Sequence, residues 1–194
     1  MGLSKKSVLF ILLVFGMLFT LVEASAAADI QTGFGGIDWG TSLNQVSGCE
    51  KVEEREAIQY CIRGDQSHTL LGEIIPAVLY GFYQETFFAV FIGIEDDEAY
   101  IQTKIRLAER LGVPETTFDR EGIVSTHKWT DRSVQIELFN DKSEQGFKLA
   151  YYYLPIAKMV PRKHKSFSPT KRSGVTFFPA KKGNIPEAVR ILEF

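Results

Sequence analysis

The pattern of apolar and polar positions separates the first 28 residues from the rest of the chain. An apolar run over residues 8–22 follows two lysines and precedes a stretch of small residues at 24–28. This run of about 15 residues is shorter than the roughly 20 that span a bilayer. Together with A-x-A sequences near Ala26 to Ala28, it predicts a cleavable signal peptide over residues 1–28. We expect a periplasmic or secreted mature chain without a membrane span; an uncleaved N-terminal anchor is the alternative.

Alternating and densely apolar segments in the remaining chain predict β-strands. Polar or glycine-containing turns bound these segments, and several segments are rich in aromatic and β-branched residues. The predicted strands cover residues 34–39, 57–63, 77–83, 87–94, 127–130, 134–139 and 147–154. Polar steps at 84–86 and 131–133 predict two hairpins, and the strands of the first hairpin are expected at the centre of the sheet.

Apolar residues at helical spacing predict one long helix. It begins at Asp96 or Asp97 as the N-cap and ends before Gly112. The apolar stripe expected to face the core consists of Ile101, Ile105, Ala108 and Leu111. A shorter helix is predicted over residues 41–46. The result is an α+β fold, in which an antiparallel sheet of about six strands has one short and one long helix packed on one face.

Charge divides the mature chain into two segments. Residues 29–157 carry 21 acidic and 11 basic side chains, whereas residues 158–194 carry 9 basic and 2 acidic ones. Such asymmetry indicates a folded domain with an appended interaction segment. We therefore expect an α+β domain over 29–157 and a mostly disordered basic tail over 158–194. Apolar residues at i, i+4 and i+7 predict a short helix over 186–193 within this tail.

Basic side chains in the tail are candidate binding residues. The clustered ones are Arg162, Lys163, Lys165, Lys171 and Arg172. Clustered positive charge attracts anionic surfaces, so an anionic envelope component or an acidic protein surface is the expected partner. Nucleic acid is not expected as a partner of an exported chain. A solvated extension without a partner is the alternative.

The two cysteines are the clearest chemical signal in the sequence. Cys49 and Cys61 can pair in an oxidising compartment. The bond would stabilise the fold by about 3 kcal/mol. Two separate free thiols are the alternative, because a sequence does not define the geometry that a disulfide requires. The spacing is not C-x-x-C, which argues against redox catalysis.

Four consecutive acidic residues are the candidate metal ligands. They are Glu95, Asp96, Asp97 and Glu98. Several converging carboxylates can bind Ca²⁺. Acidic residues also cap a helix N-terminus and complement its dipole. Because the four residues begin the predicted long helix, we interpret them as its cap, with a metal site as the alternative.

Aromatic residues crowd the predicted central strands. Alternation places Tyr80 and Phe82 in the core, together with most of the other rings. Tyr83 and Tyr152 are the candidates for an open sheet face. An exposed aromatic face is a common binding surface, so these two tyrosines are candidate binding residues.

Several short motifs follow one another between residues 34 and 154. The segment 34–42 reads F-G-G-I-D-W-G-T-S, aromatic hairpin strands occupy 80–94, and L-G-V-P and K-W-T stand at 111–114 and 128–130. In this order the motifs resemble small uncharacterised exported bacterial proteins with a G-x-x-W-G-x-S/T start. They are more distantly similar to units of outer-membrane assembly lipoproteins and β-lactamase inhibitory proteins. The resemblance implies a structural or protein-binding role without catalytic residues.

The sequence does not favour an enzyme. His68, His127 and His164 are too scattered for zinc spacing, and G-x-S-x-G does not occur. These observations favour a non-catalytic periplasmic or secreted domain that binds a protein or an envelope component, without a cofactor. A small-ligand or Ca²⁺-binding module and a hydrolase with dispersed catalytic residues are the alternatives.

Overall fold

The structure is a computed structural model that describes residues 30–75, 78–94, 96–119, 124–141, 146–161 and 189–191. The predicted signal peptide and most of the basic tail lie outside these residues. The described elements, in chain order, are β1 (Gly33–Phe34), β2 (Ile37–Asp38), the 3₁₀ turn η1 (Leu43–Gln45), β3 (Cys49–Arg55), β4 (Ile58–Arg63), β5 (His68–Leu70), β6 (Glu73–Ile75), β7 (Val78–Tyr83), β8 (Thr86–Ile94), α2 (Asp97–Leu111), β9 (Glu115–Phe118), β10 (Val124–Asp131), β11 (Val134–Asp141), β12 (Gly146–Tyr153), α3 (Leu154–Ala157) and β13 (Val189–Ile191).

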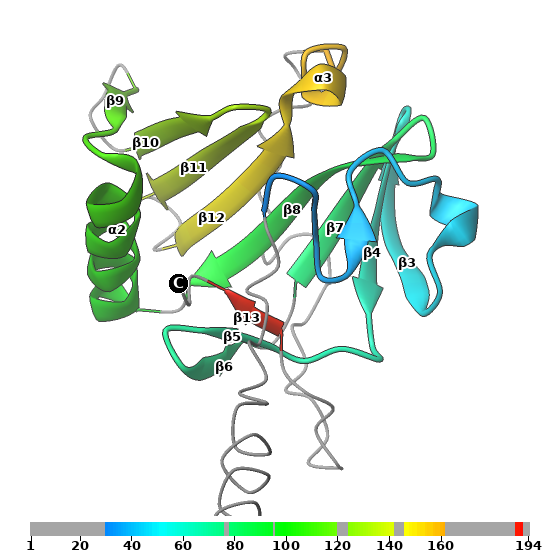
Figure 1. Ribbon diagram of the computed structural model, residues 1–194, viewed down its shortest axis with the longest axis horizontal. Helices are drawn as coiled ribbons and strands as arrows, with labels where there is room; N and C mark the ends of the chain where they lie inside the picture. The colour runs from blue at the N-terminus through cyan, green and yellow to red at the C-terminus, as the bar shows by residue number, and fades with distance from the viewer. Residues whose placement is uncertain are drawn as a thin grey trace, which may run out of the picture.

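Eight strands form one antiparallel sheet in the order β3-β4-β7-β8-β12-β11-β10-β9 (Figure 1). Both predicted hairpins, β7–β8 and β10–β11, are confirmed. Gln84 and Glu85 in the first turn have positive φ angles of 48° and 63°, as the two central residues of a two-residue hairpin turn require. The antiparallel α+β architecture is therefore as predicted, but the sheet has eight strands rather than about six. The charged β3 and the short polar β9 were missed because neither has an apolar alternation.

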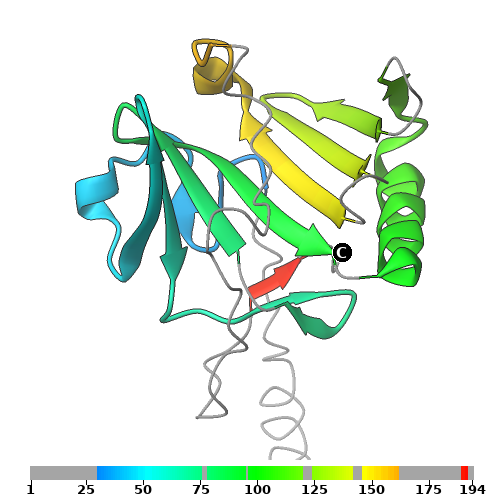
Figure 2. The same ribbon diagram turned by 180° about the vertical axis from the view of Figure 1, so that it is seen from behind.

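Two apolar clusters lie on the two faces of this sheet. The first cluster contains Tyr80, Phe82 and Phe87, which are completely buried, together with side chains from β1, β2, α2, β5 and β13. The second cluster contains Tyr60, Phe88, Phe91 and Tyr152, together with Ile156 of α3. Figure 2 shows α2 at the β9–β10 end of the sheet and α3 beyond the end of β12.

A tight hairpin replaces the single strand predicted over residues 34–39. β1 and β2 pair antiparallel through Phe34 and Ile37, and Gly35 and Gly36 form the turn between them. Their φ values of 58° and 75° explain why glycine occupies both positions. The alternation of apolar residues across 34–39 therefore reflects two short strands rather than one long strand.

Of the three predicted helices, the long one is confirmed and the two short ones need correction. The helix predicted over 41–46 is only the 3₁₀ turn η1, and Ser42 makes no side-chain capping bond there. α2 has the predicted extent, and Asp96 caps it by accepting a 2.7 Å hydrogen bond from the Ala99 amide. α3, which was not predicted, packs on the second cluster, while η1 and α2 contact the first.

A small sheet joins the C-terminal segment to the domain. β5 and β6 form a hairpin, and β13 pairs parallel with β5 in the register Val189 to His68. Residues 189–191 therefore form a strand, and the helix predicted over 186–193 is wrong at these positions. Val160 and Ile191 are both buried, so residues on either side of the basic segment belong to the packed domain.

Candidate functional site

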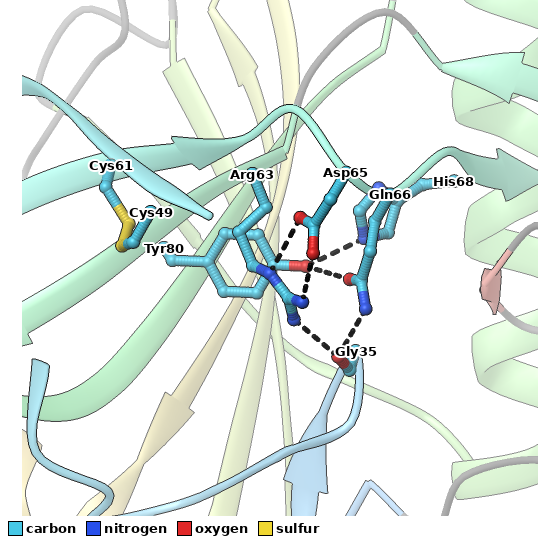
Figure 3. Close-up of polar contacts among 8 residues, drawn as sticks. All are labelled: Gly35, Cys49, Cys61, Arg63, Asp65, Gln66, His68 and Tyr80. Carbon is cyan, nitrogen blue, oxygen red and sulfur yellow. Dashed lines mark hydrogen bonds and ion pairs between the residues drawn. A yellow bond between two sulfur atoms is a disulfide. The ribbon is translucent and has the colours of Figure 1, made fainter. Parts of the chain in front are cut away.

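A buried tyrosine hydroxyl is the centre of a polar network beside the disulfide (Figure 3). Tyr80 of β7 donates a 3.2 Å hydrogen bond to Oε1 of Gln66, and its hydroxyl lies 2.8 Å from Nε2 of His68. A tyrosine hydroxyl carries one proton. Since that proton points to Gln66, Nε2 of His68 carries its own proton and donates it to the Tyr80 oxygen. His68, Tyr80 and Gln66 thus form one directed hydrogen-bond chain.

The chain continues to the turn of the N-terminal hairpin. The Gly35 carbonyl accepts 3.0 Å hydrogen bonds from Nε2 of Gln66 and from Nη1 of Arg63. A Cβ at Gly35 would lie 2.6 Å from the Tyr80 hydroxyl, so no side chain fits there. Arg63 is itself held by Asp65 through two bonds of 3.2 and 2.9 Å. The network therefore fastens the β1–β2 hairpin to β4, β5 and β7.

The environment of the network keeps its two ring residues uncharged at neutral pH. Burial, with a smaller contribution from Arg63, lowers the pKa of His68 to about 4. Burial also raises the pKa of the Tyr80 hydroxyl well above its usual value of 10.0. A histidine of low pKa is a weak general base, and a tyrosine of high pKa does not release its proton. The arrangement suits a structural clamp better than acid–base catalysis.

Acidification is expected to destabilise the fold through His68. The folded-state pKa of about 4 lies below the reference value of 6.5, so the unfolded chain binds a proton first as the pH falls. The His68 contribution is complete above pH 6.5 and is lost as the pH falls toward 4. We expect a loss of about 2 kcal/mol between roughly pH 7 and roughly pH 5. The measurement compares urea unfolding at these two pH values for the wild type and His68→Gln.

The free energy of unfolding should change less between these two pH values in H68Q than in the wild type, by about 2 kcal/mol. His127→Gln is the matched control, because burial and the nearby Lys104 also lower the pKa of His127. The difference in pH dependence between the wild type and H127Q measures the contribution of His127, so that it can be told apart from the contribution of His68. An equal pH dependence in H68Q and the wild type would show that His68 does not titrate as its environment indicates.

Two further polar contacts join β9 and the end of α2 to β10. Oγ1 of Thr116 on β9 lies 2.8 Å from Nδ1 of His127 on β10. Nε1 of Trp129 donates a 2.9 Å bond to the carbonyl of Gly112, the residue that ends α2. Tyr100 of α2 stacks on Phe147 at 4.6 Å between ring centres. The polar groups here hold elements together, as those of the first network do.

Exposed apolar side chains occur on α2 and around β9, the elements at this end of the sheet. Six large apolar side chains are exposed in the described part of the chain, and four of them lie between residues 101 and 118. We call these four the α2–β9 surface: Ile101 (47% exposed), Ile105 (43%), Val113 (95%) and Phe118 (68%). Ile101 and Ile105 belong to the stripe predicted to face the core, and this part of the prediction is wrong. The buried side of α2 consists instead of Tyr100, Thr103 and Leu107.

The predicted disulfide is confirmed, and the acidic segment acts as a helix cap. Cys49 and Cys61 are bonded, with their Cα atoms 5.5 Å apart, and they join β3 to β4. Glu95 lies outside the described residues, while Asp97 and Glu98 are exposed in the first turn of α2. The described ranges contain no group of three or more His, Cys, Asp or Glu side chains that could hold a metal ion.

The two candidate tyrosines differ in their surroundings. Tyr152 is buried in the second cluster, so it is not part of the open aromatic face that the sequence predicted. Its ring contacts the ring of Phe91 edge-on. It is buried because this face of the sheet is covered by the second apolar cluster, to which Ile156 of α3 belongs. Tyr83 is partly exposed and packs edge-on against Phe88. Arg162, Lys163, Lys165, Lys171 and Arg172 lie outside the described residues.

Sequence reasoning missed the network around Tyr80 and the α2–β9 surface. The network residues come from the β1–β2 turn, the end of β4, the loop after it, β5 and β7, so no spacing along the chain relates them. The Gly35-Gly36 pair was a usable signal, because paired glycines indicate a tight turn. The exposed isoleucines carried no signal of their own, since apolar periodicity does not tell which side of a helix is covered.

Comparison with known proteins adds no assignment. No family model, curated protein or solved structure matches the chain. The resemblance to small exported bacterial proteins therefore stays a prediction. Within the described residues, no helix has both the length and the apolar character needed to cross a membrane.

Proposed function

We propose that the mature chain is an exported, non-catalytic domain that binds a protein through the α2–β9 surface. Export is supported by the apolar, lysine-preceded segment over residues 8–22 and by the small residues that follow it. The Cys49–Cys61 disulfide fits this location, because such bonds persist in oxidising compartments outside the cytoplasm.

A non-catalytic role is supported by how the buried polar groups are used. His68 and His127, the two buried histidines of the described residues, each bond a side chain of a neighbouring element. Both have a lowered pKa, caused first by burial. A catalytic base needs a pKa near the working pH and access to a substrate. Neither histidine meets these requirements.

The concentration of exposed apolar area at one end of the sheet is the observation that carries the proposal. Val113 and Phe118 are more than half exposed; Val113 lies two residues before β9 and Phe118 is its last residue, while Ile101 and Ile105 lie on the preceding helix. Single exposed apolar residues are common, but their grouping indicates an interaction site. The fully buried centre of a protein interface is more apolar than the rest of the surface, and aromatic side chains such as that of Phe118 are enriched there.

Site-specific photo-crosslinking in the native envelope tests this proposal. A photoreactive residue at Ile101 is expected to yield one discrete crosslinked protein, which mass spectrometry identifies. Met159 is the control position, because it is 61% exposed and lies between Ala157 and Val160 of the second cluster, away from α2 and β9 in the sequence. Ile105→Glu should abolish the crosslink from position 101 without changing thermal unfolding. The same products from positions 101 and 159, or none from either, would contradict the proposal.

An anionic envelope component is a second proposed partner, and the charge asymmetry favours it. Residues 158–194 carry 9 basic and 2 acidic side chains, which suits a surface of lipid or polysaccharide phosphates. Because Val160 and Ile191 are core residues, removing the whole segment would damage the fold. Charge removal limited to Arg162, Lys163 and Lys165 is therefore the informative change.

A further inference from the structure

The two edges of the eight-stranded sheet are protected very differently. At one edge, five of the seven residues of β3 are charged, and the pairing with β4 is irregular between Lys51 and Glu53. Ion pairs join Lys51 to Glu54 and Arg55 to Glu53 along this edge. Charged side chains and bulges are the usual means by which natural sheets prevent their edges from pairing with another chain. β3 is therefore a blocked edge.

β9, at the other edge, is short, but Glu115 is its only charged residue and its pairing with β10 contains no bulge. Its sequence is Glu-Thr-Thr-Phe, all four residues are exposed, and it pairs regularly with β10. Threonine and phenylalanine both favour strands. No strand of the described residues pairs with its outer side. An edge strand with an unpaired outer side can accept a further strand through its backbone hydrogen bonds.

We propose that β9 pairs antiparallel with β9 of a second copy of the chain, so that two eight-stranded sheets join across a two-fold axis. This inference rests on the proposed function, because it names the partner that contacts the α2–β9 surface. A two-fold pair is the commonest arrangement of identical chains, and antiparallel pairing of one strand with its own copy produces that symmetry.

Hydrogen-bond geometry restricts the register of such a pair. In antiparallel strands, residues that face each other are either both hydrogen-bonded or both not, and the two kinds alternate along the strand. A strand that pairs with its own copy must therefore place the two-fold axis at a residue, not between two residues. Four positions of the axis are possible within β9, one at each of its residues.

Charge selects one of these positions. Like charges that face each other directly across two strands are destabilising. An axis at Glu115 places the Glu115 side chains of the two copies opposite each other. An axis at Thr117 places Glu115 of one copy opposite Asp119 of the other. An axis at Phe118 leaves three of the four strand residues opposite positions that lie outside β9. An axis at Thr116 opposes no like charges, because Glu115 then faces Thr117. The proposed register thus places Thr116 opposite Thr116.

The same register covers exposed apolar area. Thr116 and Phe118 lie on the sheet face occupied by His127 and α2, since Thr116 bonds His127 and alternate residues share a face. With the axis at Thr116, Phe118 of each copy faces Pro114 of the other across the strands. Phe118, 68% exposed in the single chain, gains an apolar neighbour there. Burial of this ring favours the pair through the hydrophobic effect.

Cysteine pairs can test both the contact and its register in the oxidised mature chain. In the proposed register the two Thr116 Cα atoms lie about 4.5 to 5.5 Å apart, within the range of a disulfide. The two Thr117 Cα atoms lie about 8 Å apart, beyond that range. Thr116→Cys is therefore expected to form a covalent dimer under mild oxidation, and the matched control Thr117→Cys is not. Sedimentation equilibrium of the wild type should show twice the mass of one chain.

A charge at the axis provides the second arm of the test. Thr116→Lys places two lysines opposite each other and is expected to weaken the dimer at least about tenfold. Glu54→Lys at the blocked edge β3 is the control and should leave the dimer constant unchanged. Thermal unfolding of both variants verifies that they fold, and Thr116→Val separates the loss of the Thr116 hydrogen bond to His127 from the effect of charge.

Three results would overturn the inference. One is a wild-type chain that stays monomeric at every concentration. Another is equal crosslinking of T116C and T117C, and the third is a dimer that T116K leaves intact. If the chain is monomeric while position 101 crosslinks a different protein, the second copy is the wrong partner and the proposed function stands. If position 101 crosslinks nothing in the envelope and the chain is monomeric, both proposals fail.

Discussion

Removal of the Cys49–Cys61 disulfide is expected to lower the free energy of unfolding by about 3 kcal/mol. The bond spans 12 residues and ties the edge strand β3 to β4. β3 buries little apolar surface of its own, since its residues are charged except Cys49 and Val52, which are only partly buried. The disulfide restricts the conformations of the unfolded chain, and this restriction is a large part of what stabilises β3 on the sheet. Urea unfolding of Cys49→Ala/Cys61→Ala against the oxidised wild type measures the loss.

The reduced wild type is the control for the double alanine variant. Reduction leaves both side chains in place, so a similar loss in the reduced protein and in the variant assigns the effect to the bond rather than to packing of Cys61. If both retain the midpoint of the oxidised protein, β3 is held by its hydrogen bonds to β4 alone. Far-ultraviolet circular dichroism then distinguishes a frayed β3 from an intact sheet.

The strands that the sequence predicted best are those with a buried side and a tight turn. β7 and β8 are densely apolar, β11 alternates apolar and polar residues, and short polar turns join β7 to β8 and β10 to β11. β3, β5, β6, β9 and β13 were missed for physical reasons. They are either at edges or only three or four residues long, so few of their positions must be apolar. Edge strands are recognised by what they pair with, which a single sequence does not contain.

The orientation of α2 shows the limit of helical periodicity. Both its ends were predicted, because Asp96 caps the helix and Gly112 ends it. The buried side was not, because Tyr100 stacks on Phe147 and Leu107 enters the first cluster. Burying an aromatic ring and a leucine offsets the exposure of Ile101 and Ile105. Tertiary packing therefore decided which of two apolar sides faces the sheet, and the other became part of the candidate site.

The network around Tyr80 could not be predicted, since its members are related only in space. Arg63 ends β4 and Gln66 lies in the loop after it, and both donate to the carbonyl of Gly35, which precedes them by 28 and 31 positions. Burial also changes the chemistry of the network. The pKa of His68 falls to about 4 because of its surroundings, which the sequence does not specify.

The tryptophan of the G-x-x-W-G-T-S segment has a structural role that accounts for the motif. Trp39 stacks on Phe87 at 4.6 Å and on Tyr153 at 6.0 Å between ring centres, and its Nε1 donates a 2.8 Å bond to the Ile30 carbonyl. The residues after it pair with β8: the Gly40 amide bonds the Phe87 carbonyl at 3.0 Å. Gly40 has a φ of 88°, which glycine adopts without strain.

Trp39→Ala is therefore expected to lower the free energy of unfolding by about 3–5 kcal/mol, because it opens a cavity between Phe87 and Tyr153. Trp39→Phe keeps a stacked ring and loses the bond to Ile30, so its cost should be smaller, about 1 to 2 kcal/mol. Urea unfolding of the two variants measures this order. If both variants lose the same free energy, the indole hydrogen bond rather than ring packing holds the N-terminal hairpin. A loss below that of the disulfide variant would mean that the hairpin is only loosely coupled to the core.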